Sequence, residues 1–210
     1  MTTCIVTADI DNMRGKVVLV FLRPMRAESN IRIHAWQTLA LSAGAHGVFE
    51  FDPTISLQVM QHRNETRTSS GIMVLHPGQL AVATRPSGLS PQLSMASTGN
   101  ANARLTHNQV GVRNQTLPPA TIDCIWHVGG RPMVTVPDVD QGMTCTFEYE
   151  PTLFFMVAAE QVGDGTYTVQ SFTDMTRCPI PLDCTVLRVD IHYQRHAWHF
   201  VFDPEYDPED

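Results

Sequence analysis

The sequence predicts an all-β protein built from two tandem antiparallel β-sandwich-like halves that are related by internal duplication. Three observations lead to this fold class. Short apolar runs alternate with clusters of Gly, Pro, Asn and Ser, one heptapeptide returns in the second half of the chain, and Lys16 is the only lysine. We expect no long helix, because no stretch combines strong helix formers at helical spacing.

The recurring heptapeptide is the main sign of duplication. Residues 49–55 (FEFDPTI) return 98 positions later as residues 147–153 (FEYEPTL), with four identities and three conservative changes. A duplicated unit of about half the chain explains the repeat, and chance similarity between two strands is the alternative. The proline-containing segment 116–120 separates the copies, which predicts an N-terminal half of residues 1–116 and a C-terminal half of residues 117–210.

In the first half, short apolar or alternating runs between turn residues predict strands. These runs are residues 16–22, 31–34, 48–51, 55–59, 71–75 and 80–84. The last two flank His76-Pro-Gly-Gln79, which has Pro and Gly at the central positions that a type II turn requires. The polar segment 86–103 predicts a long loop or irregular edge.

The second half repeats this pattern and ends in an acidic tail. Its predicted strands are residues 121–128, 133–136, 143–149, 153–158 and 166–172. The run of acidic residues in 203–210 predicts a solvated tail.

The segment before that tail predicts a hairpin. Apolar residues occupy odd positions through Tyr193 and even positions from Trp198 onward. An antiparallel hairpin with an even-numbered loop produces this change of parity. It would pair Tyr193 with Trp198, Ile191 with Phe200 and His192 with His199. One face is then apolar, and the other carries Asp190, His192, Gln194 and His199.

The polar face of the hairpin is the first candidate site. Two cross-strand histidines, His192 and His199, would lie about 5 Å apart at Cβ, with Asp190 diagonal to them. This arrangement suits acid–base catalysis or a metal ion. The alternative is an ordinary solvent-facing sheet face, and we assign neither a metal nor a cofactor to the chain.

A second candidate set combines tryptophan with histidine. His34-Ala-Trp36 and His196-Ala-Trp198 are identical tripeptides, and Trp126 precedes His127. A tryptophan with a polar neighbour can stack on a sugar or an aromatic ligand, so His34, Trp36, Trp126, His127 and Tyr193 are predicted ligand-binding residues. The alternative is that these tryptophans belong to the core.

Composition excludes several classes of function. The net charge of −7 and the isoelectric point near 5.6, with scattered arginines, argue against nucleic acid and anionic lipid as partners. No apolar run approaches the roughly 20 residues that span a bilayer, so we expect a soluble protein. The five cysteines lack CxxC spacing and predict reduced thiols in the cytoplasm, unless a signal peptide was removed.

The order of motifs resembles the rhizosphere-induced RhiA-like proteins over most of the chain. The similar features are a strand around Trp36, the strand 49–51, the turn 77–79 and a second unit containing residues 147–152. The resemblance implies tandem β-sandwich units in a soluble bacterial protein, and it brings no catalytic residues. The histidine-rich segment 190–199 departs from that layout.

The chain lacks nucleophile-elbow, phosphate-loop and dinucleotide motifs, which favours a binding module for a small molecule, a glycan or a protein partner. A cofactor-independent isomerase or cyclase of secondary metabolism is the alternative, in which Asp190, His192 and His199 move protons in an apolar cleft. A third possibility is an assembly protein that associates through exposed sheet edges. Whether the chain is an enzyme stays open at this point.

Overall fold

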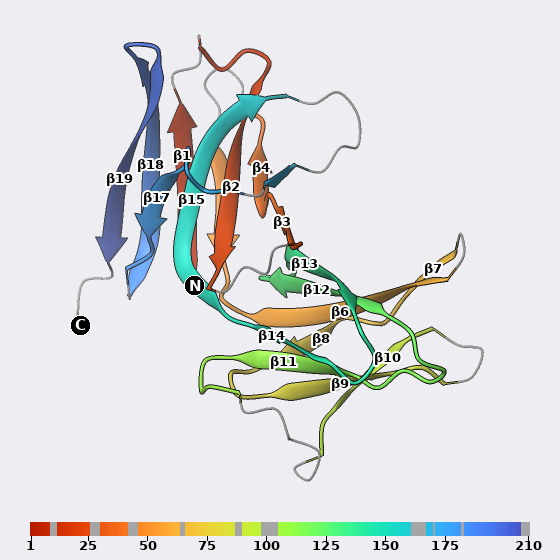
Figure 1. The fold of residues 1–210 in the computed structure, drawn as a ribbon. Helices are drawn as coiled ribbons and strands as arrows, with labels where there is room; N and C mark the ends of the chain where they lie inside the picture. Colours follow the sequence, from red (N-terminus) through yellow and green to blue (C-terminus); the bar gives the residue numbers. More distant parts are fainter. Residues whose placement is uncertain are drawn as a thin grey trace. The chain divides into compact units, whose positions relative to one another are not determined.

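The computed structural model describes residues 1–8, 12–25, 30–41, 46–63, 66–86, 90–97, 105–160, 167–169, 171–181 and 183–206. Within these residues the chain forms nineteen strands, which confirms the all-β prediction (Figure 1). No helix in this part of the chain is long and apolar enough to cross a membrane.

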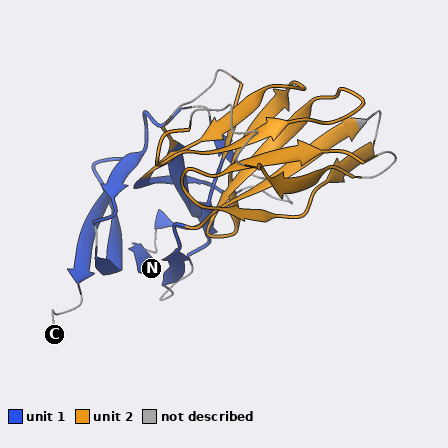
Figure 2. Cartoon of the chain, turned by 90° about the horizontal axis from the view of Figure 1, so that it is seen from below, with its two compact units in different colours: residues 1–23, 34–53, 151–210 blue, residues 24–33, 54–150 orange. Residues whose placement is uncertain are grey.

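The chain divides into two compact units that are each assembled from separate segments (Figure 2). Unit 1 contains residues 1–23, 34–53 and 151–210, and unit 2 contains residues 24–33 and 54–150. Both units therefore take residues from both predicted halves. The compact units do not coincide with the tandem halves 1–116 and 117–210, because the chain passes between the units instead of completing one before the other.

Unit 1 contains two four-stranded sheets. The first has the order β19-β18-β1-β5 and consists of β19 (Ala197–Tyr206), β18 (Cys184–Gln194), β1 (Thr2–Ala8) and β5 (Gly47–Phe51). The second has the order β17-β15-β2-β4 and consists of β17 (Thr176–Pro179), β15 (Tyr149–Ala159), β2 (Lys16–Pro24) and β4 (Gln37–Leu39). The two-residue strand β16 (Thr168–Val169) also belongs to this unit and is shorter than the predicted strand 166–172.

Unit 2 contains the remaining strands, again in two sheets. One has the order β10-β9-β11-β14 and consists of β10 (Gln92–Met95), β9 (Leu80–Thr84), β11 (Val110–Asn114) and β14 (Thr144–Phe147). Within unit 2, the strands of the other sheet have the order β3-β13-β12-β6-β7. They are β3 (Arg32–His34), β13 (Arg131–Val139), β12 (Ile122–Val128), β6 (Ile55–Arg63) and β7 (Thr66–Ser69), and β8 (Met73–Leu75) also pairs with β6.

The prediction of purely antiparallel sheets was wrong in one sheet of each unit. β1 pairs in parallel with β18, from Thr3 opposite Val186 to Ala8 opposite Ile191, and β11 pairs in parallel with β9. The sequence gives little local sign of such pairs, because parallel partners are joined by long connections and not by a hairpin turn. β1 itself was not predicted.

These two mixed sheets share one pairing pattern. In unit 1, β1 lies between its antiparallel partner β5 and its parallel partner β18, and β18 pairs with β19. In unit 2, β11 lies between its antiparallel partner β14 and its parallel partner β9, and β9 pairs with β10. In order along the sheets, β19, β18, β1 and β5 therefore correspond to β10, β9, β11 and β14, with the same relative strand directions.

Other local predictions have mixed outcomes. The predicted turn at residues 76–79 is confirmed, since the Gln79 N–H donates to the His76 carbonyl at 3.0 Å and Gly78 has a φ of 83°. For the segment 86–103, predicted as a long loop or irregular edge, the described residues include the edge strand β10, which pairs with β9 and ends its sheet. Residues 203–206 of the predicted acidic tail continue β19, while 207–210 lie outside the described residues.

Each unit has an aromatic core at the recurring heptapeptide. Trp36 is buried in unit 1, where its ring centroid lies 5.7 Å from the centroids of Phe49 and Phe51. Trp126 is fully buried in unit 2 and stacks on Phe147 at 5.0 Å. The first phenylalanine of each heptapeptide thus packs against a buried tryptophan, an arrangement that stabilises a core beyond the area it buries.

Asn114 organises the loops at one end of unit 2. Its side chain is fully buried, and its Nδ2 donates to the carbonyls of Ala120 and Val139 at 2.8 and 2.9 Å. Its Oδ1 accepts from the backbone N–H and the hydroxyl of Thr116 at 3.0 and 2.9 Å. This amide therefore ties two loops to β11, and the Asn-Gln-Thr motif at 114–116 has a structural role.

We predict that Asn114→Ala lowers the free energy of unfolding of unit 2 by about 3 kcal/mol, because the change removes the side-chain partner of the Thr116 N–H and of the Val139 carbonyl at a buried position. Urea denaturation of the full chain measures this loss. Asn108→Ala makes the same chemical change at an exposed position and should shift stability by less than about 0.5 kcal/mol. Equal effects of the two substitutions would contradict the assigned role.

Candidate binding site

The predicted terminal hairpin is confirmed in its register. Tyr193 lies opposite Trp198, Ile191 opposite Phe200 and His192 opposite His199. The loop consists of Arg195 and His196, both with positive φ (52° and 66°). These values are typical of a type I′ turn, which matches the twist of the flanking strands but normally uses Asn and Gly.

The polar face of the hairpin is open. The structure brings Asp190, His192 and His199 together on this face, and all three side chains are exposed. Asp190 accepts a hydrogen bond from the Thr7 hydroxyl of β1. Among the described residues, no group of three or more His, Cys, Asp or Glu side chains is arranged to hold a metal ion.

The opposite face of the hairpin is apolar and only partly covered. Phe200 and Phe202 pack against Phe155 of β15, with ring centroids 5.8 and 5.6 Å apart. The ring centroids of Trp198 and Tyr193 lie 4.8 Å apart, and the Lys16 Nζ lies 5.3 Å from the centroid of the Trp198 ring. Tyr193, Trp198, Phe200 and Phe202 all remain partly exposed, so this side of the hairpin presents aromatic surface.

The free edge of the hairpin is the unusual feature of the molecule. β19 ends its sheet, and no described strand pairs with it on the side away from β18 (Figure 1). It is ten residues long, whereas the other strands that end the sheets within each unit have three to five residues. Native proteins generally keep edge strands short or charged, because their unpaired N–H and C=O groups bind other strands.

The hairpin register determines which backbone groups face outward. In a two-residue hairpin the pair that closes the loop, Gln194 and Ala197, is hydrogen-bonded, and the pattern alternates from there. The N–H and C=O groups of Trp198, Phe200 and Phe202 therefore point away from β18. Pro204 follows in the same series, and its missing N–H lies on the free edge, where proline is tolerated.

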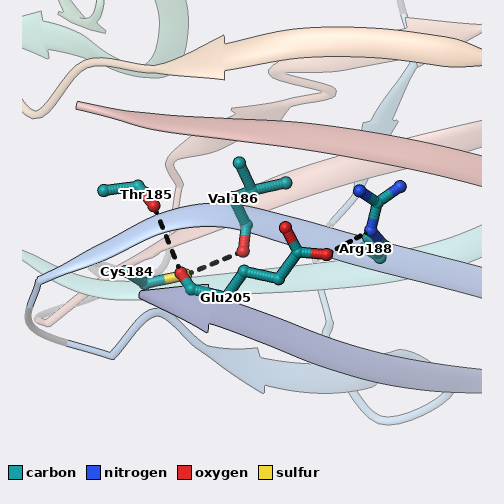
Figure 3. A network of polar contacts seen from close by, with 5 residues as sticks. All are labelled: Cys184, Thr185, Val186, Arg188 and Glu205. Carbon is teal, nitrogen blue, oxygen red and sulfur yellow. Dashed lines mark hydrogen bonds and ion pairs between the residues drawn. The ribbon is translucent and has the colours of Figure 1, made fainter. Parts of the chain in front are cut away.

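Polar contacts fix the far end of β19 to β18 (Figure 3). The Arg188 Nε donates to Glu205 at 2.5 Å, and the Thr185 hydroxyl donates to the Glu205 carbonyl at 3.4 Å. Within β18, the Cys184 thiol donates to the Val186 carbonyl at 3.3 Å. The Arg188–Glu205 pair is exposed, so it fixes geometry more than it adds stability.

The other predicted ligand-binding residues belong to elements outside this hairpin. Trp126 and His127 belong to unit 2, where both side chains are buried. His34 and Trp36 belong to unit 1, with Trp36 in the core and His34 half-buried at the end of β3. Burial of both indoles favours the core alternative over a ligand-stacking role.

A His–Asp pair in unit 2 was missed by the sequence analysis. The His62 Nε2 lies 3.0 Å from the Asp123 Oδ2, and the Asp123 Oδ1 accepts from the Asp138 N–H at 3.1 Å. The two residues are 61 positions apart on the paired strands β6 and β12, so no local pattern relates them.

Unit 2 also has a surface pocket of about 180 Å³ beside β13. Asp138, Asp140, Met143 and Cys145 contribute to its walls, and Asp138 has a φ of 55°. The Asp138 amide joins the pocket wall to the His62–Asp123 pair.

No protein-family model, curated protein or solved structure matches this chain. The function is therefore inferred from the residues and geometry described above.

We predict that His127 makes the stability of unit 2 fall in acid. Burial lowers the pKa of His127 from 6.5, partly opposed by a backbone interaction with Ile125. Below pH 6.5 the unfolded chain takes up a proton that the folded unit excludes, so the free energy of unfolding declines by up to about 1.4 kcal/mol per pH unit. His127→Gln should remove this slope in urea titrations between about pH 7.5 and 5, and the exposed His192→Gln should retain it.

We predict that an Asn-Gly loop stabilises the hairpin. Residues with side chains cost about 1–2 kcal/mol each in the left-handed conformation, and Asn and Gly tolerate it best. Arg195→Asn with His196→Gly should therefore raise the melting temperature of unit 1. Ala197→Gly, placed just after the loop, should lower it. A lower melting temperature for the Asn-Gly variant would rule out the type I′ loop.

Proposed function

We propose that this chain is a partner-binding protein that captures an extended polypeptide segment along the free edge of β19. The open ten-residue edge is the observation that carries the proposal. Three aromatic residues present their N–H and C=O groups outward at Trp198, Phe200 and Phe202, and an added strand would pair with them. Their partly exposed rings offer contacts for alternate side chains of that strand.

The distribution of charge along β19 supports the capture of an added strand. From Trp198 to Phe202 the strand has no formal charge at neutral pH, whereas Asp203 and Glu205 follow at its far end. Main-chain hydrogen bonds would supply affinity, and the charged end would help to set the direction and register of the added strand.

We also infer that the two units arose by internal duplication, in agreement with the RhiA-like resemblance. Two observations support it. The mixed sheets of the units share one pairing pattern, and the chain passes between the units within or beside each copy of the recurring heptapeptide, at residues 53–54 and 150–151. In this scheme each unit combines the first part of one copy with the last part of the other.

A second candidate function is small-molecule binding or proton-transfer catalysis in unit 2. The His62–Asp123 pair is linked to the pocket wall through the Asp138 amide, which favours this alternative over catalysis by Asp190, His192 and His199 on an open sheet face. Backbone in the left-handed region at Asp138 is the kind of strain that occurs at functional sites. A thermal-shift screen with sugars, metals and aromatic compounds tests it, because a ligand of the folded state raises stability. A shift lost on His62→Ala would support the second candidate.

Strand capture is tested with a displayed library of random ten-residue peptides, selected on the full chain. We predict that the selected peptides alternate apolar residues and protect the amides of Trp198, Phe200 and Phe202 from hydrogen exchange. Val201→Lys should weaken their binding, whereas Val48→Lys, on the opposite edge of the same sheet and comparably exposed, should not. Selected peptides that leave these three amides unprotected would exclude strand capture at β19.

A further inference from the structure

We propose that the segment captured by β19 is β19 of a second copy of this chain, which gives a symmetric dimer with one continuous eight-stranded sheet. The proposal rests on strand capture at this edge and names the partner. A twofold axis requires that the strand be complementary to itself in antiparallel alignment. The sequence of β19 meets this requirement about Val201.

Alignment about Val201 brings compatible side chains together. Val201, 52% exposed, faces Val201 of the second copy, and His199 faces Asp203 of the second copy at both ends. On the apolar face, Phe200 lies beside Phe202 of the second copy. A histidine ring N–H can donate to a carboxylate, and aromatic pairs at directly opposed positions stabilise antiparallel strands.

The same alignment also satisfies the backbone. Outward-facing groups belong to even-numbered residues, and the axis at Val201 places even positions opposite even positions. Phe200 and Phe202 would exchange both hydrogen bonds with Phe202 and Phe200 of the second copy. The Trp198 N–H would donate to the Pro204 carbonyl. The missing N–H of Pro204 then removes one bond at each end and leaves the centre intact.

The contacts within each hairpin favour the twofold axis at Val201 over an axis at Phe202. Moving the axis to Phe202 would place His199 opposite Glu205 of the second copy. Glu205 already accepts from Arg188 within its own hairpin, at 2.5 Å. Asp203 lies opposite Arg188 in the hairpin, but the Arg188 Nε donates to Glu205. The axis at Val201 therefore uses the histidine–aspartate pair and keeps the Arg188–Glu205 pair.

Sedimentation of the full chain over a dilution series tests the dimer. Val201→Lys places two lysines face to face and should raise the dimer dissociation constant about tenfold or more. Val48→Lys makes the same change at a comparably exposed valine on β5, the opposite edge of the sheet, and should leave it within about twofold. A wild-type chain that remains monomeric, or equal loss with both variants, would overturn the proposal.

Disulfide trapping tests the register. Val201→Cys should form a covalent dimer on mild oxidation, because residue 201 meets itself at a closely spaced pair. His199→Cys alone should not, since the two copies of residue 199 would lie about 14 Å apart along the strands. His199→Cys combined with Asp203→Cys should restore the covalent dimer. Cross-linking of His199→Cys alone would overturn the register.

The native cysteines should not interfere with disulfide trapping. All five are buried and none forms a disulfide, and burial, with neighbouring thiols, raises the pKa of Cys4 and Cys178 to about 12. Burial also keeps the native thiols from the oxidant, so the exposed introduced cysteine reacts first.

The peptide selection distinguishes failure of the dimer from failure of strand capture at β19. If wild type and Val201→Cys stay monomeric while selected peptides protect the β19 amides, the second-copy proposal fails and strand capture stands. If neither a second copy nor any peptide protects these amides, both fail.

Discussion

The parallel pairing of β1 with β18 is the interaction on which unit 1 depends. It joins Thr3 through Ala8 to Val186 through Ile191 and places the two strands at the centre of their sheet. β5 on one side and β19 on the other are attached to this central pair. Without it, the hairpin β18–β19 would be an isolated two-stranded ribbon, which is marginally stable in water.

That constraint also explains why β19 is exposed. The hairpin is added to the sheet through β18, so β19 is necessarily the last strand. In the other sheet of unit 1, the end strand β17 has only four residues. The rings of Phe200 and Phe202 contact Phe155 but stay partly exposed. The long edge and its aromatic row thus follow from the topology of unit 1 and from the length of the terminal hairpin.

Local patterns predicted local structure well. The change of parity between Tyr193 and Trp198 fixed the register of the terminal hairpin, because a two-residue loop leaves one way to pair alternating faces. The same patterns could not reveal the parallel partner of β1, the segments that make up each unit, or the His62–Asp123 pair. Each of these depends on strands distant in sequence. Trp126 and His127 are adjacent on β12, where neighbouring side chains point to opposite faces, and Trp36 lies outside any strand, two residues after His34. Closeness in the sequence therefore does not define a site.

The segmented construction of unit 1 has a consequence for biosynthesis. A nascent chain would have every segment of unit 2 available once Glu150 has left the ribosome, whereas β1 and β2, made first, must wait for β15, β18 and β19. Domains fold as units during synthesis, so the inner part of the chain would mature before its beginning does. A chain cut short before residue 184 would release a folded unit 2 joined to unmatched strands, a natural substrate for chaperones and proteases.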